Sequence, residues 1–342
     1  MRRLDAALVS TPRLEGESGV KPPHSKEAIS DLMNASNEIL TSSAVCTAET
    51  NIGKSLTRSI RPFLVLAKPE ITLMVMISAG VGSLMASTSF RSIVLVHSVL
   101  GIGLLAAGVS ALNQYFEREL DGRMRRTSRR PLPAGELNPG QAFVFGVAIS
   151  LCGMLYILLL LNALTALLGL LTLVTYLFVY TPLKRKTRLC TFVGAFPGAA
   201  PVLMGWSAMT NSLNLEAWTL YAILFLWQFP HFYAIGWLYR EDYARVGMLM
   251  LPSQDEHDEG TTFRLILLST QLLIIASFLL TFFAHSGTAY LLSALILGIC
   301  FYHFAYQASL TRSKLAAKRL LHASVIYLPL LYLFMIIDRI DG

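Results

Sequence analysis

Long apolar stretches, separated by short polar segments, dominate the chain after residue 60. Each contains roughly 18 to 25 residues, which as an α-helix is long enough to cross a hydrocarbon layer about 30 Å thick. The stretches lie near residues 63–85, 93–113, 141–161, 163–182, 189–209, 216–238, 265–284, 287–308 and 320–337. The pattern predicts an all-α polytopic membrane protein with a bundle of nine transmembrane helices.

The boundary between the third and fourth stretches is the least distinct of the eight. Only Asn162 interrupts the apolar run there. A single helix could not absorb about 40 apolar residues, so we expect two spans.

Composition agrees with this pattern and limits the cysteine chemistry. Of the 342 residues, 54% are hydrophobic and 14% charged, and the mean hydropathy is +0.56, as in membrane proteins. Cys46, Cys152, Cys190 and Cys300 lie far apart without a CxxC pair, so we assign neither a disulfide nor a metal site to them.

Residues 1–60 differ from the rest of the chain. They mix Ser, Thr, Asn, Pro and charges of both signs without apolar periodicity, which predicts a mostly disordered tail and a membrane domain over residues 61–342. A mitochondrial transit peptide would be poor in acids. The tail contains Asp5, Glu15, Glu17, Glu27, Asp31, Glu38 and Glu49. We therefore expect a bacterial-type plasma (inner) membrane.

Basic residues alternate between the two ends of the expected helices. They occur before the first span, between Arg123 and Arg130, between Lys184 and Arg188, at Arg240 and Arg245, and between Arg312 and Arg319. The positive-inside rule then places the N-terminus in the cytoplasm and, with nine spans, the C-terminus outside. The net charge of +7 is accounted for by topology and anionic substrates, and we expect no nucleic acid partner.

A stripe of oxygen-bearing side chains ends the second span. Asn113, Glu117 and Asp121 are spaced i, i+4, i+8, which on a helix leaves them within about 80° of one another. Mg²⁺ prefers one or two carboxylates together with phosphate oxygens and water. We call these three residues the ladder, and they predict a magnesium site.

Five arginines follow the ladder directly, and guanidinium groups are suited to phosphate. They are Arg123, Arg125, Arg126, Arg129 and Arg130. Charges at this position could also do no more than anchor the topology. That alternative fits the arginines better than the ladder, since carboxylates contribute little to topology and polar residues within a membrane helix are costly.

A second constellation closes the sixth span on the same side. The segment "QFPHFYAIGWLYREDYARVGMLMLP", residues 228–252, carries His231 in its apolar part and Arg240, Glu241, Asp242 and Arg245 at its edge. The basic segment "YTPLKRKTR", residues 180–188, lies between the two constellations. Two acidic sites beside basic loops suggest a diphosphate held between metal ions and cations.

These segments resemble the UbiA superfamily of intramembrane prenyltransferases. The ladder is similar to its NxxxDxxxD signature, and "RMRRTSRRPLPAG" resembles the haem O synthase (protohaem IX farnesyltransferase) branch. The segment "FPHFYAIGWLYREDYARVGMLMLP" resembles that branch's second motif, and "AKPEITLMV" and "YTPLKRKT" are also similar to it. The likeness covers about residues 60–340.

The resemblance implies a nine-helix enzyme that transfers the farnesyl group of farnesyl diphosphate to a vinyl group of haem B. Water completes the reaction, and haem O and diphosphate are released. Haem O serves terminal oxidases directly or after conversion to haem A, so a haem A synthase is an expected partner. Mg²⁺ is the expected cofactor, and haem B is a substrate.

The resemblance also implies the roles of individual residues. Asn113, Glu117, Asp121 and Asp242 would hold the metal and act in catalysis, while His231 and Tyr239 would lie on the haem side. The expected diphosphate contacts are Lys68, Arg125, Arg129, Lys184, Arg185, Arg240 and Arg245. A lone membrane histidine is also often a hydrogen-bonded packing residue, so His231 has that alternative.

The chain departs from the family pattern in both motifs. Glu117 stands where the signature usually has Asp, one methylene further from the backbone, and we expect it still to ligate. Tyr239 and Tyr243 occupy places where the wider superfamily often has Asp, which leaves Asp242 as the acid placed for a second metal, with Glu241 pointing elsewhere.

Two other functions fit part of the pattern. One is a UbiA-type transferase acting on an aromatic quinone precursor. The other is a transporter or haem-handling membrane protein without chemistry, although no convincing pair of inverted repeats is visible.

Overall fold

The computed structural model describes residues 60–86, 92–254, 259–283 and 287–341, and every regular element in these ranges is a helix. The tail predicted over residues 1–60 lies outside this part of the chain except for Ile60. Residues 60–66 form a short helix that precedes the first long helix.

Each of the nine predicted spans coincides with a helix. Eight are continuous: α2 (Pro69–Ala86), α3 (Ser92–Arg123), α4 (Pro139–Leu160), α7 (Cys190–Thr210), α8 (Leu215–Leu238), α11 (Glu259–Phe283), α12 (Thr288–Thr311) and α13 (Lys314–Asp341). The other is composed of α5 (Ala163–Val174), the π-helix η1 (Thr175–Tyr180) and α6 (Thr181–Leu183). Two short helices follow α8, namely α9 (Arg240–Arg245) and α10 (Leu251–Gln254).

Eight of these helical stretches are long and apolar enough to cross a membrane. The helix outside this set is α8, which has 24 residues but carries two tryptophans, a glutamine, a histidine and a proline in its second half. It packs against α7, α11 and α13, so it is surrounded by other helices rather than by lipid alone. The protein is a multi-pass membrane protein, and α8 is one of its inner helices.

The predicted break at Asn162 is present. Leu160 ends α4 and Ala163 begins α5. The Asn162 side chain accepts a hydrogen bond from the backbone N–H of Thr165 at 2.9 Å, which caps the new helix. Its amide group also donates to the carbonyl of Ser207 at 2.7 Å, so the same residue ties the turn to α7.

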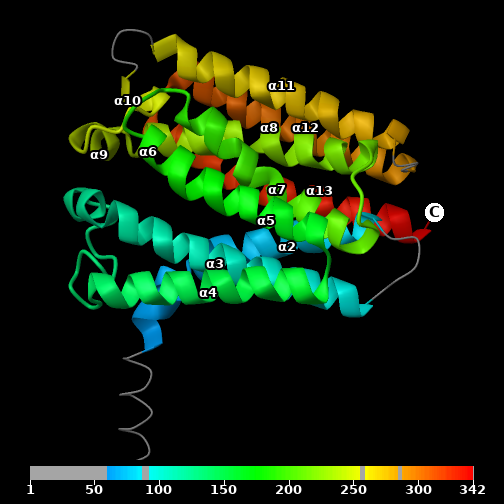
Figure 1. Ribbon diagram of the computed structural model, residues 1–342. Coiled ribbons are helices and arrows are strands. Elements are labelled where there is room, and N and C mark those ends of the chain that lie inside the picture. Colours follow the sequence, from blue (N-terminus) through cyan, green and yellow to red (C-terminus); the bar gives the residue numbers. More distant parts are fainter. Residues whose placement is uncertain (1–59, 87–91, 255–258, 284–286, 342) are drawn as a thin grey trace, which may run out of the picture. The chain divides into compact units, whose positions relative to one another are not determined.

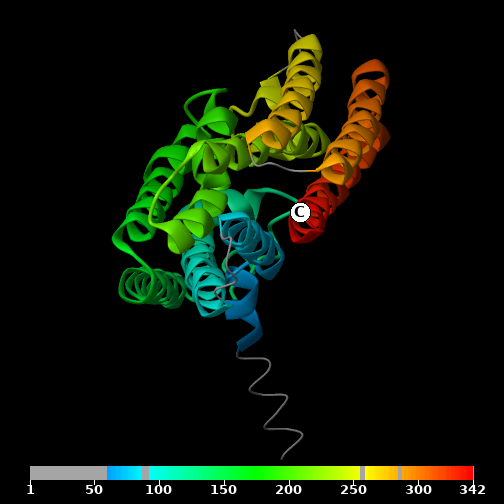
Figure 2. The same cartoon turned by 90° about the vertical axis from the view of Figure 1, so that its right-hand side faces the viewer.

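The helices pack largely in sequence order, with additional contacts between helices that are distant along the chain. α2 lies against both α3 and α7, α8 lies against both α11 and α13, and α13 returns to α2. Figures 1 and 2 show α2–α5 and α11–α13 as two groups joined by α7 and α8. The segment after α3, α6, α9 and α10 gather at one end of the bundle, on the left in Figure 1.

Small residues allow α2 and α7 to approach closely. A Cβ on Gly205 would collide with the carbonyl oxygen of Ala79, and one on Gly82 with the carbonyl oxygen of Val202. Helix association in lipid depends on such close van der Waals packing, because lipid tails are as apolar as the side chains. Both helices also lie against α3, which carries Asn113, Glu117 and Asp121.

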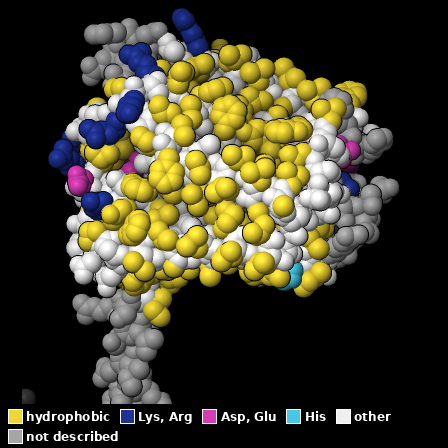
Figure 3. All heavy atoms as spheres, in the orientation of Figure 1, with side chains coloured by type: hydrophobic (Ala, Val, Ile, Leu, Met, Phe, Trp, Pro, Cys, Tyr) yellow, Lys and Arg dark blue, Asp and Glu magenta, His cyan; other side chains and the backbone are white. Residues whose placement is uncertain are grey.

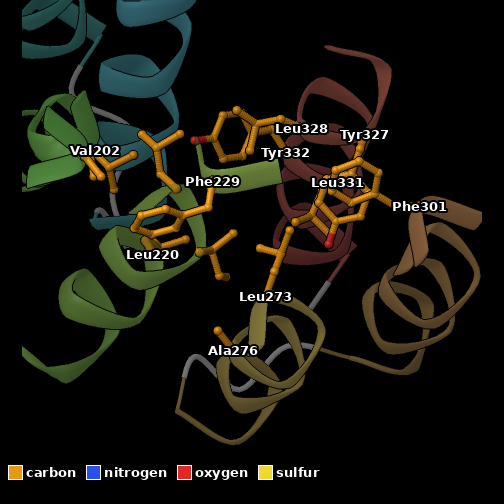
Figure 4. Packing of buried hydrophobic residues seen from close by; sticks show 14 of the residues in the cluster. Val202, Leu220, Phe229, Leu273, Ala276, Phe301, Tyr327, Leu328, Leu331 and Tyr332 are labelled. Atoms are coloured by element: carbon orange, nitrogen blue, oxygen red, sulfur yellow. The ribbon is translucent and has the colours of Figure 1, made fainter. Parts of the chain in front are cut away.

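The largest apolar cluster lies between α7, α8 and the last three helices (Figure 4). Its labelled members include Val202, Leu220, Phe229, Leu273 and Phe301. Outside the core, hydrophobic side chains cover the middle of the face in Figure 3, while Lys and Arg side chains gather toward its left end. That end is the one where α6 and α9 lie in Figure 1.

Candidate active site

The ladder faces the interior of the bundle, as the spacing predicts. Asn113, Glu117 and Asp121 are exposed by only 2%, 6% and 1%, whereas Phe116, which points to another side of α3, is 44% exposed. α3 continues to Arg123, beyond the end of the predicted apolar stretch, and so keeps all three side chains on one helical face. Three buried oxygen-bearing groups in a membrane helix require partners.

Cations from three separate segments supply those partners. Lys68 donates to Asn113 Oδ1 at 3.2 Å, Lys184 Nζ lies 2.7 Å from Glu117 Oε1, and an Arg130 guanidinium nitrogen lies 2.7 Å from Asp121 Oδ2. The Asn113 amide group also donates to Thr181 Oγ1 at 3.2 Å. The site therefore combines two carboxylates and one amide with three basic side chains.

Local backbone geometry directs Lys68 into the site. It adopts φ +47°, a left-handed conformation that costs a non-glycine residue about 1–2 kcal/mol. This conformation turns the chain between the helical segment 60–66 and α2, where Pro69 takes the first helical position. Burial, followed by the charges of Arg130 and Lys184, lowers the pKa of Lys68 to about 7.

Lys184 follows directly after the π-helix and α6. Its ammonium lies 4.7 Å from the centre of the Tyr180 ring, and its backbone carbonyl accepts from the N–H of Leu249 at 2.8 Å. Burial disfavours its charged form, but Glu117 and then Tyr180 outweigh burial and raise the pKa of Lys184 above its ordinary value. π-helical turns are frequent at functional sites, and this one sets the position of Tyr180 and Lys184.

The second acidic segment has a different set of contacts. Asp242 Oδ1 lies 2.7 Å from a guanidinium nitrogen of Arg245, and Asp242 Oδ2 accepts from the backbone N–H of Arg126 at 3.2 Å. Glu241 points away toward Lys314 at 2.7 Å, as expected, and both of those side chains are largely exposed. Both oxygens of Asp242 are thus already engaged by arginine residues.

His231 is held in place from two sides. Its Nδ1 lies 2.8 Å from Ser324 Oγ, and its ring stacks on Trp227 with the centroids 4.7 Å apart. Ser324 Oγ also donates to the carbonyl of Leu321 at 2.6 Å. Because the Ser324 hydroxyl proton is used in that bond, Ser324 Oγ accepts a hydrogen bond from Nδ1–H of His231. The free lone pair of the imidazole is then on Nε2.

The ladder is chemically suited to a magnesium ion. Across the described ranges no group of three or more His, Cys, Asp or Glu side chains could hold a metal alone. The ladder contributes two carboxylates and an amide oxygen, and Mg²⁺ completes such a set with water and phosphate oxygens. The ladder therefore fits a magnesium ion that arrives with a phosphate ligand better than a resident ion held by protein alone.

Comparison with protein families decides what kind of enzyme carries this site. The UbiA prenyltransferase family matches residues 75–327, a range that includes the ladder, Lys184, Asp242 and His231. The chain belongs to the UbiA prenyltransferase family. It is a membrane prenyltransferase, and the family recognised from the ladder and the second motif is confirmed.

Relatives within the UbiA family match nearly their whole length. A protein named protoheme IX farnesyltransferase from Solibacter usitatus is 44% identical, with 82% of this chain and 99% of the relative covered. One of the same name from Koribacter versatilis is 41% identical, with 82% and 94% covered.

Solved structures show the UbiA fold. The structure of a digeranylgeranylglyceryl phosphate synthase has a TM-score of 0.69 at 17% identity and covers 83% of this chain and 99% of its own. A UbiA homologue from Archaeoglobus fulgidus bound to GPP and Mg²⁺ has a TM-score of 0.57 at 13% identity, with 82% and 98% covered. At these identities the likeness concerns the fold.

Only some of the basic residues that were predicted for the site of this UbiA protein contact the ladder. Lys68 and Lys184 do. Arg125, Arg129 and Arg185 are exposed and make no side-chain hydrogen bond or ion pair with any described residue. Arg240 and Arg245 contact residues close to them in the sequence. Arg240 lies over the Trp237 ring, and Arg245 pairs with Asp242.

The structure adds residues that sequence reasoning did not assign to the site. Arg130 contacts Asp121, Thr181 contacts Asn113, and Ser324 orients His231. Arg130 is the last arginine of its run and stands directly before Pro131, but nothing in the run distinguishes it from its neighbours. Ser324 lies 93 positions from His231, so no local spacing could have indicated it.

Proposed function

We propose that this protein is a haem O synthase, which transfers the farnesyl group of farnesyl diphosphate to a vinyl group of haem B. The observation that carries the proposal is the buried ladder, with three basic groups converging on it at the end of an apolar bundle. Such a site suits a charged head group attached to a long apolar chain. The choice of haem B rests on the relatives named protoheme IX farnesyltransferase.

We propose that Asn113, Glu117 and Asp121 bind Mg²⁺ together with the diphosphate. A UbiA homologue from Archaeoglobus fulgidus has been solved with GPP and Mg²⁺, which supports a metal-dependent prenyl transfer. When bound, Mg²⁺ supplies positive charge that stabilises the leaving diphosphate. We leave Asp242 out of this metal set, because Arg245 and Arg126 already engage both of its oxygens.

The basic side chains of the site act on the same leaving group. Lys184, Lys68 and Arg130 lie within hydrogen-bonding reach of the ladder and would donate to diphosphate oxygens as the carbon–oxygen bond breaks. The bonding electrons leave with the diphosphate, and C1 of the farnesyl group forms a bond to the terminal vinyl carbon of haem B. Water adds to the neighbouring carbon and loses a proton, which gives the hydroxyethylfarnesyl group of haem O.

We place haem B beside His231. Its Nδ1–H is committed to Ser324, so Nε2 can accept a proton or approach the haem iron. Along α8, His231 lies eight residues before Tyr239, about 12 Å of helix rise. The histidine is therefore deeper in the bundle than Tyr239 and Asp242. Tyr239 packs on Arg126, and we do not retain it on the haem side.

We further propose that the ladder end faces the cytoplasm of a bacterial-type plasma membrane, with the C-terminus outside. The support is the gathering of Lys and Arg side chains at that end (Figure 3). A periplasmic-type reporter fused after Gly342 should be active. Activity of a cytoplasmic reporter at that position would contradict the proposed orientation with nine spans.

Pigment analysis in a host that lacks its own haem O synthase tests the proposed activity. Membranes from cells carrying this gene should contain haem O, and membranes from cells carrying Asp121→Asn should contain only haem B at equal protein level. Absence of haem O with the wild-type gene, while its membranes still consume farnesyl diphosphate, would favour the alternative acceptor, an aromatic quinone precursor.

A further inference from the structure

The turn that follows α3 is bound to both α3 and α9. On the α3 side, Thr127 Oγ1 donates to the backbone carbonyl of Asp121 at 2.9 Å, and Arg130 pairs with the Asp121 carboxylate. On the α9 side, the N–H of Arg126 donates to Asp242. We call residues 124–130 the arginine turn. It spans from the ladder to the second motif, so its position depends on both.

Asp242 is the anchor on the side of α9. Burial opposes its ionisation, but hydrogen bonds from the backbone N–H groups of Arg126 and Arg125 and the charge of Arg245 together hold the pKa of Asp242 below its usual value. Asp242 as a whole residue is 8% exposed, and each of its carboxylate oxygens contacts an arginine residue. A divalent cation placed there would approach the same oxygens against the positive charge of Arg245.

The two tyrosines of the second motif complete the attachment. The Arg126 guanidinium donates to Tyr243 Oη at 3.1 Å and lies 4.8 Å from the centre of the Tyr239 ring. Met124, the first residue of the arginine turn, is buried in one cluster with Tyr243 and Val246. By the resemblance to the UbiA superfamily, acids would be expected at the two tyrosine positions. Here aromatic groups at those positions bind an arginine.

We propose that the second motif of this protein binds the arginine turn and no metal ion, and that Asp242 is a positioning residue acting through Arg130. This inference rests on the proposed function, in which Arg130 contacts the diphosphate. Asp242 fixes the backbone at Arg126, four residues before Arg130, and thereby sets where the Arg130 guanidinium meets Asp121 and the incoming ligand.

Counting bound Mn²⁺ ions separates a positioning role from a ligating one. Purified protein would be titrated with Mn²⁺ in the presence of farnesyl thiodiphosphate, a slowly reacting analogue, and the free ion followed by electron paramagnetic resonance. Wild type, Asp242→Asn and Tyr243→Phe should bind the same number of ions. Loss of one ion per chain in Asp242→Asn would overturn the proposal.

A double-mutant cycle tests whether Asp242 acts through Arg130. Asp242→Asn and Arg130→Gln should each weaken binding of the analogue by about tenfold, the size expected when a charge-assisted hydrogen bond is lost. The double variant should bind no more weakly than Arg130→Gln alone, since the two changes remove one interaction. Fully multiplicative losses would overturn the proposal.

Two further variants control for misfolding and for a general effect of charge. Tyr243→Phe removes only the hydroxyl that accepts from Arg126, so it should fold normally and weaken binding by about threefold, a loss that Arg130→Gln should again mask. Glu241→Gln, a neighbouring change at an exposed pair, should leave binding unchanged. These binding measurements need no haem, so a failure of the proposed haem O activity would be detected separately in the wild type.

Discussion

Asp121 and Asp242 look alike when taken singly. Each is a buried carboxylate at the same end of the bundle, and each lies 2.7 Å from an arginine guanidinium. They differ in their neighbours. Asp121 shares a helical face with the oxygens of Asn113 and Glu117, whereas Asp242 contacts the Arg245 guanidinium and the backbone N–H of Arg126. Acidity at a membrane edge is therefore a weak argument for a metal site, and our proposal for the ladder rests on several oxygens on one helical face.

The ladder as a whole and Asp242 also differ in where their charged side-chain partners come from. Arg245 is three residues from Asp242, on the same short helix. The ladder instead draws on distant segments, since Lys184 lies 67 positions from Glu117 and Lys68 lies 45 positions from Asn113. Long side chains from separate segments can exchange a carboxylate for a phosphate oxygen without unwinding a helix. A ligand-binding site needs cations that can change partners in this way, whereas a structural ion pair does not.

The largest effect is expected at the ladder. Asp121→Asn and Glu117→Gln should each lower turnover of farnesyl diphosphate at least 100-fold, because loss of one group that stabilises a leaving group typically costs about 3–4 kcal/mol. The matched control is Glu119→Gln on the same helix, whose side chain is 81% exposed. If all three variants kept wild-type rates in a membrane assay of haem O formation, the ladder would be no more than a topology anchor.

A smaller loss is expected from the cations. Lys184→Met should reduce kcat/KM by about 30-fold, since it removes a charge-assisted contact and leaves Glu117 buried without its partner. Lys186→Met, two residues away and exposed, serves as its control and should stay within about twofold of wild type. Equal losses in both variants would mean that the general positive charge of the loop matters rather than the contact to Glu117.

His231 and Ser324 test whether haem B binds at a place separate from the diphosphate site. His231→Ala should weaken haem B binding by about tenfold, and Ser324→Ala by less, because Ser324 only orients the ring. Binding of farnesyl thiodiphosphate should be unchanged in both. The Soret band of bound haem should shift in Ser324→Ala and be restored in Ser324→Thr. Loss of diphosphate binding with haem binding retained would contradict the proposed division of the pocket.

The smallest effect is expected from Glu117→Asp. The shorter side chain restores the residue usual in the family signature but moves the carboxylate one methylene away from Lys184. We expect turnover within about fivefold of wild type, well short of the loss for Glu117→Gln. A loss as large as that of Glu117→Gln would show that the reach of Glu117 to Lys184 is required here.

The helices of the fold and the ladder of the site could be predicted, because both follow from helical periodicity. The positions of the helices, the break at Asn162 and the shared face of the ladder depend on residues within a few turns of one another. Which arginine of a run reaches Asp121 depends instead on how the turn after α3 packs against α9. The same holds for Ser324, which reaches His231 only because α8 and α13 lie side by side.

α8 is less apolar than a membrane-spanning helix usually is, although it packs among the other long helices of the bundle. Its tryptophans, Gln228 and His231 lower its hydropathy below that of the eight helices that meet the criterion for a span. Those polar groups are satisfied inside the bundle, where Gln228 donates to the carbonyl of Ala195 at 3.0 Å. Burial by other helices, which sequence periodicity does not reveal, allows a long helix to carry them.

The acceptor of the farnesyl group is the central claim, and a competition assay tests it most directly. Purified protein in lipid nanodiscs would receive farnesyl diphosphate, Mg²⁺, haem B and an equal amount of 4-hydroxybenzoate, with products identified by mass spectrometry. The account predicts haem O as the farnesylated product, formed by wild type and not by Asp121→Asn. Farnesylated 4-hydroxybenzoate with unchanged haem B would contradict it.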